Sequence, residues 1–279
     1  MKNILFFGAT SKLGKYWIKN LSIKNIVYCN IHLNKKVFKN KNIKKVKINL
    51  SKKEDAYLFC KKNNISIIIN CIGLASIEEC EKKKKKATKI NYGIPSELCN
   101  VSKKMDIPFV HISTDMLFNG DTVKKYDEKS HYNPINVYAR TKVKAEKFIS
   151  KYKKSLIIRA NFFGHGEKIN QTISDKLIYE QKSKKKSYLW NNIFFTPIYI
   201  PNLIYFINLL IKNKFMGIFN ISSDQCISKY DFGLRIVKKI IKNNKILSNK
   251  FDKRNFVKRP KNMCLSKNKL KRKFKKYQY

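Results

Sequence analysis

Short runs of apolar residues alternate with stretches of helical periodicity through the first part of the chain. Because these runs show no polar alternation, both of their faces must be covered, as in a parallel sheet with helices on either side. This order of elements predicts an α/β fold built on a doubly wound parallel sheet. The predicted strands are residues 3–7, 26–30, 46–48, 65–71, 108–113 and 155–159, and the predicted helices are residues 12–21, 54–62, 87–105 and 137–152.

The regular alternation fades from Gly164 onward. The remainder predicts a strand over 193–199, a helix with Pro201 in its first turn that ends near Ile211, a strand over 217–222 and a helix over 229–241. No Pro/Gly-rich linker separates the two parts. We therefore expect a domain of residues 1–163 and a smaller lobe of residues 164–279 that is partly interleaved with it.

Residues 187–211 carry no charge, and they form a stretch long enough to suggest a membrane span. Pro197 and Pro201 interrupt it, so the helix that follows Pro201 would cross only about half of a bilayer. We expect this stretch to lie in the protein core and predict no membrane partner.

Lysine supplies most of an unusually large positive charge, since Lys+Arg 62 against Asp+Glu 18 gives +44. Only six of the basic residues are arginine, whereas nucleic-acid interfaces favour arginine because its planar fork pairs with phosphates and bases. The lysines are also spread along the whole chain. They predict a solvated basic surface that attracts small anionic substrates, with no specific nucleic-acid partner.

The seven cysteines contain no C-x-x-C pair, and no histidines cluster with them at metal-binding spacing. An odd, scattered set predicts reduced thiols, a cytoplasmic location and no metal site. The apolar stretch near the N-terminus is soon interrupted by Ser11 and Lys12, which makes it shorter than a secretory signal.

Two of the nine glycines lie where the first strand meets the first helix, in the segment Gly8-Ala-Thr-Ser-Lys-Leu-Gly14. Glycines are needed where a turn is tight and where backbone N–H groups approach a pyrophosphate at a helix N-terminus. Ser11 stands where a further glycine is usual, and it is still a small residue. The segment favours a dinucleotide-binding loop, with an ordinary strand-to-helix turn as the alternative.

Tyr138 and Lys142 lie four residues apart on a predicted helix and therefore share one face. A nearby cation favours the phenolate and lowers the tyrosine pKa, as general acid catalysis requires. With 15 tyrosines and so many lysines, chance gives roughly three such pairs, and we interpret Tyr57 and Lys61 as a second pair on a helix surface. Thr114 distinguishes the first pair because it ends a strand, where open α/β sheets bind ligands. Its hydroxyl would hold a carbonyl oxygen while Tyr138 supplies a proton.

The motifs follow one another in the order GATSKLG, IIINCIG, STDMLFNG, NVYARTK, FFG, FTPIYIPNL, GIFNIS and KRP. In this order the chain resembles the extended short-chain dehydrogenase/reductases, and among them the dTDP-4-dehydrorhamnose reductase-like sugar-nucleotide enzymes. The resemblance covers nearly the whole chain. It implies a Rossmann domain that binds NADPH or NADH, a smaller lobe for a nucleotide-sugar substrate, a homodimer, and a role in polysaccharide biosynthesis.

The resemblance also assigns site residues. The catalytic positions are Thr114, Tyr138 and Lys142. The cofactor-binding positions are Gly8, Thr10, Ser11, Lys12, Leu13, Gly14, Asn49, Leu50, Asn70, Cys71, Ile72 and Gly73, together with Tyr138 and Lys142. The substrate-binding positions are Met116, Phe118, Asn161 and Arg259. The chain departs from the family pattern at Ser11, at Asn49 in place of Asp, and at Gly73 in place of Ala.

Met116 separates two reaction types within this resemblance. The related 4,6-dehydratases carry Thr-Asp-Glu and use both carboxyl groups as acid and base, whereas a thioether exchanges no protons. The chain is therefore expected to reduce a keto group with NAD(P)H. The alternatives are an NDP-sugar 4-epimerase, a non-catalytic sugar-nucleotide or NAD(P)-binding regulatory module, and, because of the charge, a nucleic-acid-binding protein with steeply salt-dependent affinity.

The residues after the second predicted strand bear on which dinucleotide is used. NAD-preferring Rossmann proteins usually place a carboxylate there, which bonds the ribose 2′-OH and repels a 2′-phosphate. Residues 31–36 contain no carboxylate, and His32, Lys35 and Lys36 would favour an added phosphate. The sequence predicts a modest preference for NADPH.

Overall fold

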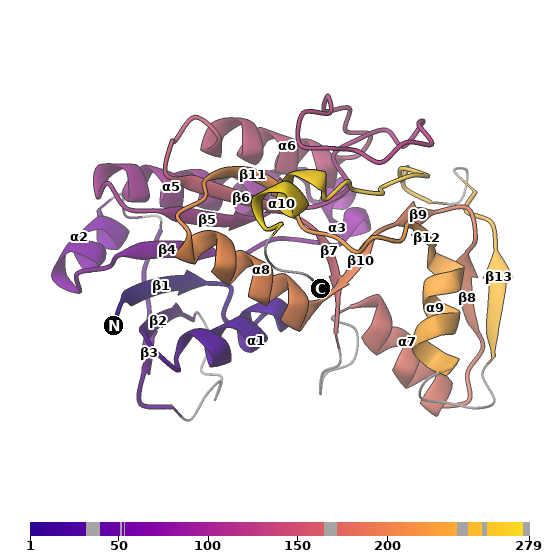
Figure 1. Ribbon diagram of the computed structural model, residues 1–279, viewed down its shortest axis with the longest axis horizontal. Helices are drawn as coiled ribbons and strands as arrows, with labels where there is room; N and C mark the ends of the chain where they lie inside the picture. Colours follow the sequence, from indigo (N-terminus) through magenta and orange to yellow (C-terminus); the bar gives the residue numbers. More distant parts are fainter. Residues whose placement is uncertain are drawn as a thin grey trace.

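A computed structural model describes residues 1–31, 40–50, 52, 54–164, 172–238, 245–252 and 256–275 of the chain. Within this part, a seven-stranded sheet has the order β11-β6-β5-β4-β1-β2-β3, and every neighbouring pair is parallel. This confirms the predicted α/β fold with a doubly wound parallel sheet (Figure 1). The strands are β1 (Asn3–Phe7), β2 (Ile26–Asn30), β3 (Ile43–Val46), β4 (Ile67–Asn70), β5 (Phe109–Ile112), β6 (Ser155–Arg159) and β11 (Gly217–Asn220).

Helices cover both faces of this sheet, because successive strand residues point to opposite sides and both sides are apolar. Phe6 of β1 packs with one set of helices and Phe7 with the other. The first set is α1 (Lys12–Leu21), α8 (Ile200–Lys212) and α10 (Asn268–Lys273). The second set is α2 (Asp55–Lys62), α5 (Ile94–Lys104) and α6 (Val137–Ile149).

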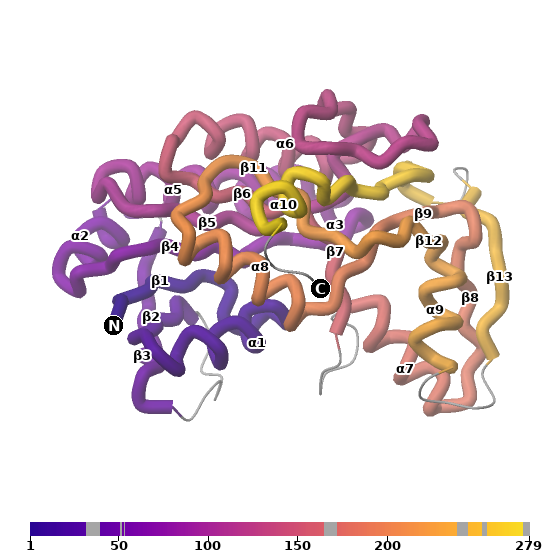
Figure 2. The backbone as a smooth tube through the Cα atoms, in the orientation of Figure 1, coloured from indigo at the N-terminus to yellow at the C-terminus, as the bar shows by residue number. Residues whose placement is uncertain are grey.

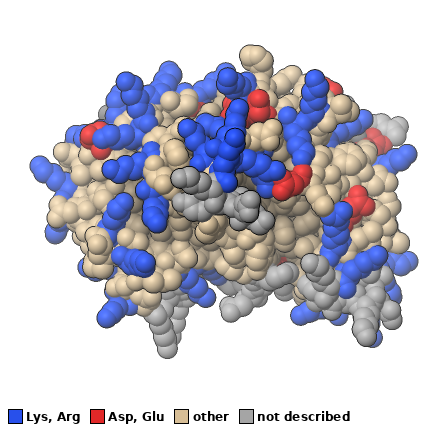
Figure 3. Space-filling model, in the orientation of Figure 1, with Lys and Arg blue, Asp and Glu red and all other residues tan. Residues whose placement is uncertain are grey.

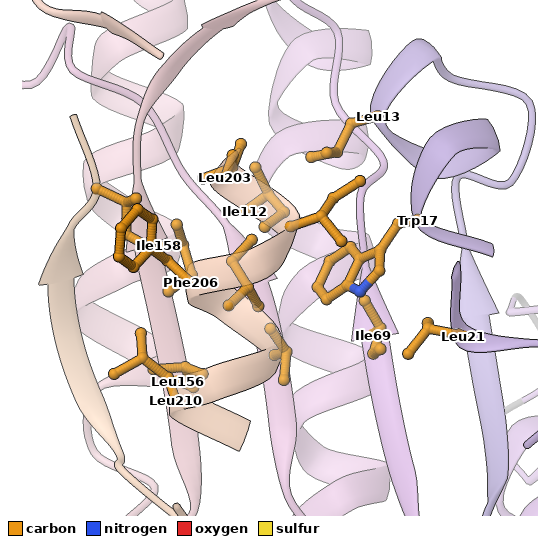
Figure 4. Close-up of a cluster of buried hydrophobic side chains, with 14 of the residues drawn as sticks. Leu13, Trp17, Leu21, Ile69, Ile112, Leu156, Ile158, Leu203, Phe206 and Leu210 are labelled. Carbon is orange, nitrogen blue, oxygen red and sulfur yellow. The ribbon is translucent and has the colours of Figure 1, made fainter. Parts of the chain in front are cut away.

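The core beneath α1 and α8 is large and aromatic. Figure 4 shows Trp17 of α1 above Ile69 on one side of α8, and Phe206 and Leu210 of α8 beside Ile158 and Leu156 on the other. The indole is fully buried, and its Nε1 donates a hydrogen bond of 2.8 Å to Asn208 Oδ1, so this polar atom is satisfied. One face of α8 thus lies in the core, as expected for the uncharged stretch, whereas Tyr188, Phe194 and Tyr205 of the same stretch are exposed. None of the described helices has the length and apolarity needed to cross a bilayer.

The helix predicted over 87–105 contains a π-helical turn, and this turn makes contacts with neighbouring elements. The chain forms α3 (Ile77–Lys82) and α4 (Lys84–Thr88), then a π-helical turn η1 (Lys89–Gly93), and continues as α5. Asn91 in the π turn is fully buried. Its Oδ1 accepts from the Leu74 amide at 2.7 Å, and its Nδ2 donates to Thr141 Oγ1 of α6 at 3.1 Å. The π turn therefore connects α6 to the segment that follows β4.

A second group of elements lies beside the end of the sheet, at the right of Figures 1 and 2. It contains helices α7 (Ile173–Lys182) and α9 (Lys229–Lys238), and the paired strands β8 (Ser187–Trp190) with β13 (Ile246–Asn249), β9 (Phe194–Phe195) with β12 (Ile227–Ser228), and β7 (Asn161–Phe163) with β10 (Pro197–Tyr199). Helix α8 and strand β11 come after residue 163 but pack on or join the central sheet, so the predicted lobe of residues 164–279 is extensively interleaved with the first domain. The division of the chain after residue 163 stays a prediction.

Three expectations about local structure need correction. The strand expected over 46–48 is β3, four residues at 43–46, whose central lysines are exposed because an edge strand need not be apolar. The strand expected over 193–199 is split between β9 and β10, which pair with different partners. The expectation of reduced thiols is wrong for Cys226 and Cys264, which form a disulfide with Cα atoms 5.6 Å apart.

The charge distribution is consistent with a solvated basic surface. On the face shown in Figure 3, Lys and Arg are scattered over the molecule, with acidic residues between them. The basic side chains do not gather into a single stripe on this face. This arrangement provides no continuous track for a nucleic-acid backbone on the visible side.

Two identical substitutions at sites of different burial test the core. Leu210 on the inner face of α8 is fully buried, whereas Leu58 on α2 is 55% exposed. We expect Leu210→Ala to lower the free energy of unfolding by about 2–5 kcal/mol, because it leaves a cavity in a packed core. Leu58→Ala should change it by less than about 0.5 kcal/mol. Urea unfolding followed by circular dichroism measures both, and equal losses in the two variants would contradict the described packing.

Candidate active site

A cavity of about 440 Å³ opens at the carboxyl ends of the central strands. This is the edge of an open parallel sheet at which ligands bind. Its walls come from segments far apart in the sequence. They include residues 11–13 at the start of α1, 71–73 after β4, 112–115 after β5, Tyr138 and Lys142 of α6, and 160–162 after β6.

The glycine loop brings the N-terminus of α1 to this cavity. Gly8 has φ +87°, and a Cβ there would lie 2.6 Å from the Cys71 carbonyl carbon. A Cβ at Gly14 would lie 2.2 Å from the Gly8 carbonyl oxygen, so the turn is too tight for any side chain. Ser11 caps the helix: its Oγ accepts from the Gly14 amide at 3.0 Å and donates to the Gly8 oxygen at 2.7 Å.

This loop fits the pyrophosphate of a dinucleotide. Ser11, Lys12 and Leu13 line the cavity at the positive end of a ten-residue helix, where backbone N–H groups and the helix dipole favour an anion. The serine that departs from the glycine pattern serves as the helix cap. Gly73, where the family pattern has Ala, is a smaller change, because a Cβ at this position would lie 3.6 Å from Asn91 Oδ1 and would therefore fit.

Lys12 makes a contact that the sequence did not indicate. Its ammonium forms a buried ion pair with Asp175 of α7 and donates to the Gly164 carbonyl oxygen at 2.5 Å. Asp175 also belongs to a capping box with Thr172 at the start of α7. The glycine loop is thereby attached to the second group of elements across the cavity.

Thr114, Tyr138 and Lys142, the three predicted catalytic residues, all line the cavity. Helix α6 is fixed at its start by Asn136, whose Oδ1 accepts from the Ala139 amide at 2.8 Å. Lys142 is 3% exposed; its Nζ lies 2.8 Å from the Ile112 carbonyl oxygen and 3.1 Å from His111 Nε2.

The protonation of this pair differs from the sequence-based expectation. Burial raises the pKa of Tyr138 to about 12, and its hydrogen bond with Thr114 only partly opposes the rise. Burial also lowers the pKa of Lys142 to about 8, against the opposing influence of Glu146 and Cys71. The expected lowering of the tyrosine pKa by Lys142 is therefore wrong for this structure, because desolvation dominates and the lysine is directed to the main chain of β5.

Two further charged groups line the cavity, Asp115 and Lys229 at the start of α9. Burial raises the pKa of Asp115, whereas Lys229 and the hydrogen bond from Asn161 Nδ2 at 2.9 Å oppose the rise. Burial lowers the pKa of Lys229 to about 8, and Asp115 opposes that shift. The STD motif offered a signal for Asp115. Nothing in the sequence set Lys229 apart from the other lysines.

The predicted substrate residues are only partly brought together. Asn161 lines the cavity, whereas Met116, Phe118 and Arg259 lie outside its lining. Phe118 is 1% exposed and stacks on Tyr126 at 4.0 Å between ring centroids, so its ring is part of the core and not of a substrate site. The Arg259 guanidinium pairs with Glu78 and lies over the Trp190 ring at 5.0 Å.

The predicted cofactor residues also divide between the cavity and its surroundings. Ser11, Lys12, Leu13, Cys71, Ile72 and Gly73 line the cavity, and Gly8, Thr10, Gly14 and Asn70 lie in the segments that support these residues. Asn49 and Leu50 are not part of the lining; the Asn49 amide donates to Asp55, and Leu50 packs on the core near α2. His32, Lys35 and Lys36 lie outside the described residues.

The chain is similar to known proteins in both sequence and structure. The family described as RmlD substrate binding domain matches residues 1–278. The probable low-salt glycan biosynthesis reductase Agl14 of Haloferax volcanii is 26% identical over 179 residues, which are 62% of this chain but only 59% of that protein. A hypothetical dTDP-4-dehydrorhamnose reductase from Sulfolobus tokodaii is a structural neighbour with a TM-score of 0.83 and 26% identity, covering 98% of this chain and 94% of that one. The dTDP-4-dehydrorhamnose reductase of Bacillus anthracis in complex with NADP has the same TM-score and coverage, with 22% identity.

Paired glycine substitutions test the tight turn of the loop. Gly14→Ala should lower the free energy of unfolding by about 1–3 kcal/mol, because its Cβ collides with backbone that cannot move without displacing β1. Gly73→Ala should stay within about 1 kcal/mol of the wild type, because its Cβ has room. Chemical unfolding midpoints at an unchanged m-value measure both. A Gly14→Ala protein as stable as the Gly73→Ala protein would refute this description of the turn.

Proposed function

The chain belongs to the RmlD substrate binding domain family, as its resemblance to the sugar-nucleotide reductases predicted, and we propose that it reduces a keto group on a nucleotide-activated sugar. One observation carries the proposal. Thr114, Tyr138 and Lys142 share a cavity with the N-terminus of α1 and its glycine loop. A dinucleotide on that loop and a carbonyl group beside the hydroxyl groups would occupy the same space.

We assign the proton transfer to Tyr138. With its pKa raised to about 12 in the ligand-free cavity, the phenol is protonated at neutral pH and has a proton to donate. General acid catalysis is most efficient with a pKa near the working pH, so this rise weakens Tyr138 as an acid until ligands bind. The Thr114 hydroxyl lies beside it and would donate to the same carbonyl oxygen, fixing that oxygen for attack at the carbon. The nicotinamide cofactor supplies the hydride when bound. Lys142 lies one helical turn after Tyr138 and would bind the cofactor.

We assign cofactor binding to the segments that line the cavity. Residues 11–13 would hold the pyrophosphate, and the turn over 70–73 would lie beside a ribose. We assign sugar binding to Asn161, whose side chain donates a hydrogen bond to Asp115 in the cavity wall. The relative Agl14 is named for glycan biosynthesis, which supports a place in polysaccharide assembly. A cytoplasmic location and a homodimer remain part of this proposal.

Removing the Tyr138 hydroxyl tests the assignment. Tyr138→Phe should bind the cofactor and lose about 10²–10⁴-fold in turnover, because general acid catalysis is lost while the ring is kept. Tyr57→Phe is the matched control; Tyr57 lies on α2, under the Lys104 ammonium at 3.7 Å, and should leave turnover unchanged. The assay follows net NAD(P)H consumption with a panel of UDP-, dTDP-, GDP- and CDP-linked keto sugars, which also separates a reductase from an epimerase. Turnover of Tyr138→Phe within a factor of about three of the wild type would remove the residue from this role.

The choice of dinucleotide can be tested by steady-state kinetics. Asn30 ends β2 and is 5% exposed; its Oδ1 accepts from the Ile48 amide at 2.9 Å, and residues 31–36 carry no carboxylate. Nothing in that sequence repels a 2′-phosphate, so kcat/KM should be modestly higher with NADPH than with NADH. A kcat/KM for NADH about tenfold above that for NADPH would contradict the proposal.

A further inference from the structure

Three buried polar side chains form a row behind the cavity wall. Asn70 of β4 and His111 of β5 are fully buried, and Lys142 of α6 is 3% exposed. Asn70 Nδ2 lies 3.1 Å from His111 Nδ1, and His111 Nε2 lies 3.1 Å from Lys142 Nζ. Buried polar atoms need partners of the correct donor or acceptor type, so the direction of each bond in this row can be deduced.

The direction is set at the end of β4. The Ile72 amide N–H donates to Asn70 Oδ1 at 3.0 Å, which leaves the Nδ2 group of Asn70 facing His111. An amide NH₂ only donates, so His111 Nδ1 must accept. Burial holds the pKa of His111 well below its ordinary value, and the ring is therefore neutral. Its single proton consequently lies on Nε2.

That proton points at Lys142. An ammonium group has three donors and no lone pair, so it cannot accept from Nε2–H, whereas a neutral amine can. The Lys142 Nζ also donates to the Ile112 carbonyl oxygen at 2.8 Å. A neutral amine satisfies both contacts: its lone pair accepts from His111, and one of its hydrogens binds the Ile112 carbonyl oxygen.

We propose that His111 is a positioning residue that favours the neutral-amine form of Lys142 over the ammonium in the ligand-free site, through a one-way chain of hydrogen bonds that begins at the Ile72 amide. Its relevance to turnover rests on the proposed function. If Lys142 Nζ gained a proton, an ammonium N–H would face the N–H on His111 Nε2. To avoid this, the ring proton would have to move from Nε2 to Nδ1. The Asn70 amide would then have to turn over and place its NH₂ against the Ile72 N–H.

The charged and titratable groups around Lys142 have opposing effects on its pKa. Glu146, one turn later on α6, and the Cys71 thiol after β4 favour the ammonium, whereas burial favours the amine. Glu146 is itself paired with Arg159, which reduces its effect on the lysine. Tyr138, one turn earlier on α6, is a neutral phenol at ordinary pH because its pKa is raised to about 12. The bond from His111 adds to the effect of burial.

The first test reads the ring proton directly in the ligand-free wild type. In ¹⁵N NMR spectra of histidine-labelled protein, a protonated ring nitrogen is distinguished from a bare one by its shift. The chain has four histidines, and the His111 signals are those lost in His111→Leu. Above pH 8, where Lys142 is mainly the amine, we expect a proton on Nε2 and a bare Nδ1. In Asn70→Asp, whose carboxylate only accepts, the proton should move to Nδ1. A wild-type ring protonated on Nδ1 would overturn the proposal, as would an Asn70→Asp ring still protonated on Nε2.

The second test titrates Lys142 in protein labelled with ¹³C at the lysine Cε, assigned by the signal lost in Lys142→Arg. We expect an inflection near pH 8 in the wild type, with the amine as the form above it. His111→Leu removes the donor, so the inflection should rise by about one unit or more, a tenfold gain in proton affinity. His131→Leu is the matched control, because His131 is exposed and should leave the inflection in place. An unmoved inflection in His111→Leu would overturn the proposal.

Both tests use the ligand-free protein and require no turnover. Failure of the proposed reaction is read instead from the Tyr138→Phe assay, so the two outcomes are independent. If His111→Leu does not fold, the wild-type ¹⁵N spectrum still decides where the proton lies, because the His111 signals are those that remain in each of His32→Leu, His131→Leu and His165→Leu.

Discussion

The Glu146 carboxylate is the interaction on which the active-site geometry depends. It is fully buried, and it accepts from Arg159 Nε and Nη2, from the Tyr132 hydroxyl at 2.8 Å and from Ser113 Oγ. A buried carboxylate without such partners would strongly destabilise the fold, so the end of β5, β6 and the 132 loop are held to α6 at this point. Glu146 follows Lys142 and Tyr138 at four-residue spacing and shares their helix face. Its bonds therefore fix the rotation of α6 that aims the phenol and the amine at the cavity.

A second buried ion pair fixes the opposite wall. Lys12 and Asp175 are separated by 163 residues, and their side chains are 5% and 3% exposed. The pair joins the glycine loop to the capping box of α7, so the helix N-terminus that faces the cavity and the lobe beyond it are positioned together. Because a lone partner would be a buried, unpaired charge, the two sides of the cavity are coupled more strongly than surface pairs such as Lys104 with Glu54 could achieve.

Sequence reasoning succeeded where the determinants are local. The bounds of β1 and α1 were predicted to the residue, because an apolar run, a glycine with positive φ and the Ser11 cap all lie within one short segment. Thr114, Tyr138 and Lys142 do line one cavity, because the i, i+4 spacing on a helix and the position at a strand end are both local features; their catalytic roles stay a prediction. The role of Phe118 was wrong, because its ring direction is decided by packing on Tyr126. Asp175, Lys229 and the Cys226–Cys264 disulfide were missed, because each depends on contacts between distant segments that a single sequence does not encode as a pattern.

Charge is distributed unevenly between the walls and the reacting face. Glu146 with Arg159 and Lys12 with Asp175 keep full charges in direct pairs, where each ion is compensated by its partner and by further hydrogen bonds. At the reacting face, burial instead favours the uncharged forms, raising the pKa of Tyr138 and lowering that of Lys142. A desolvated phenol and amine avoid the cost that an isolated charge would incur there. In the proton transfer that we propose for Tyr138, the phenolate would therefore arise in a region that disfavours it, which increases its tendency to recover a proton.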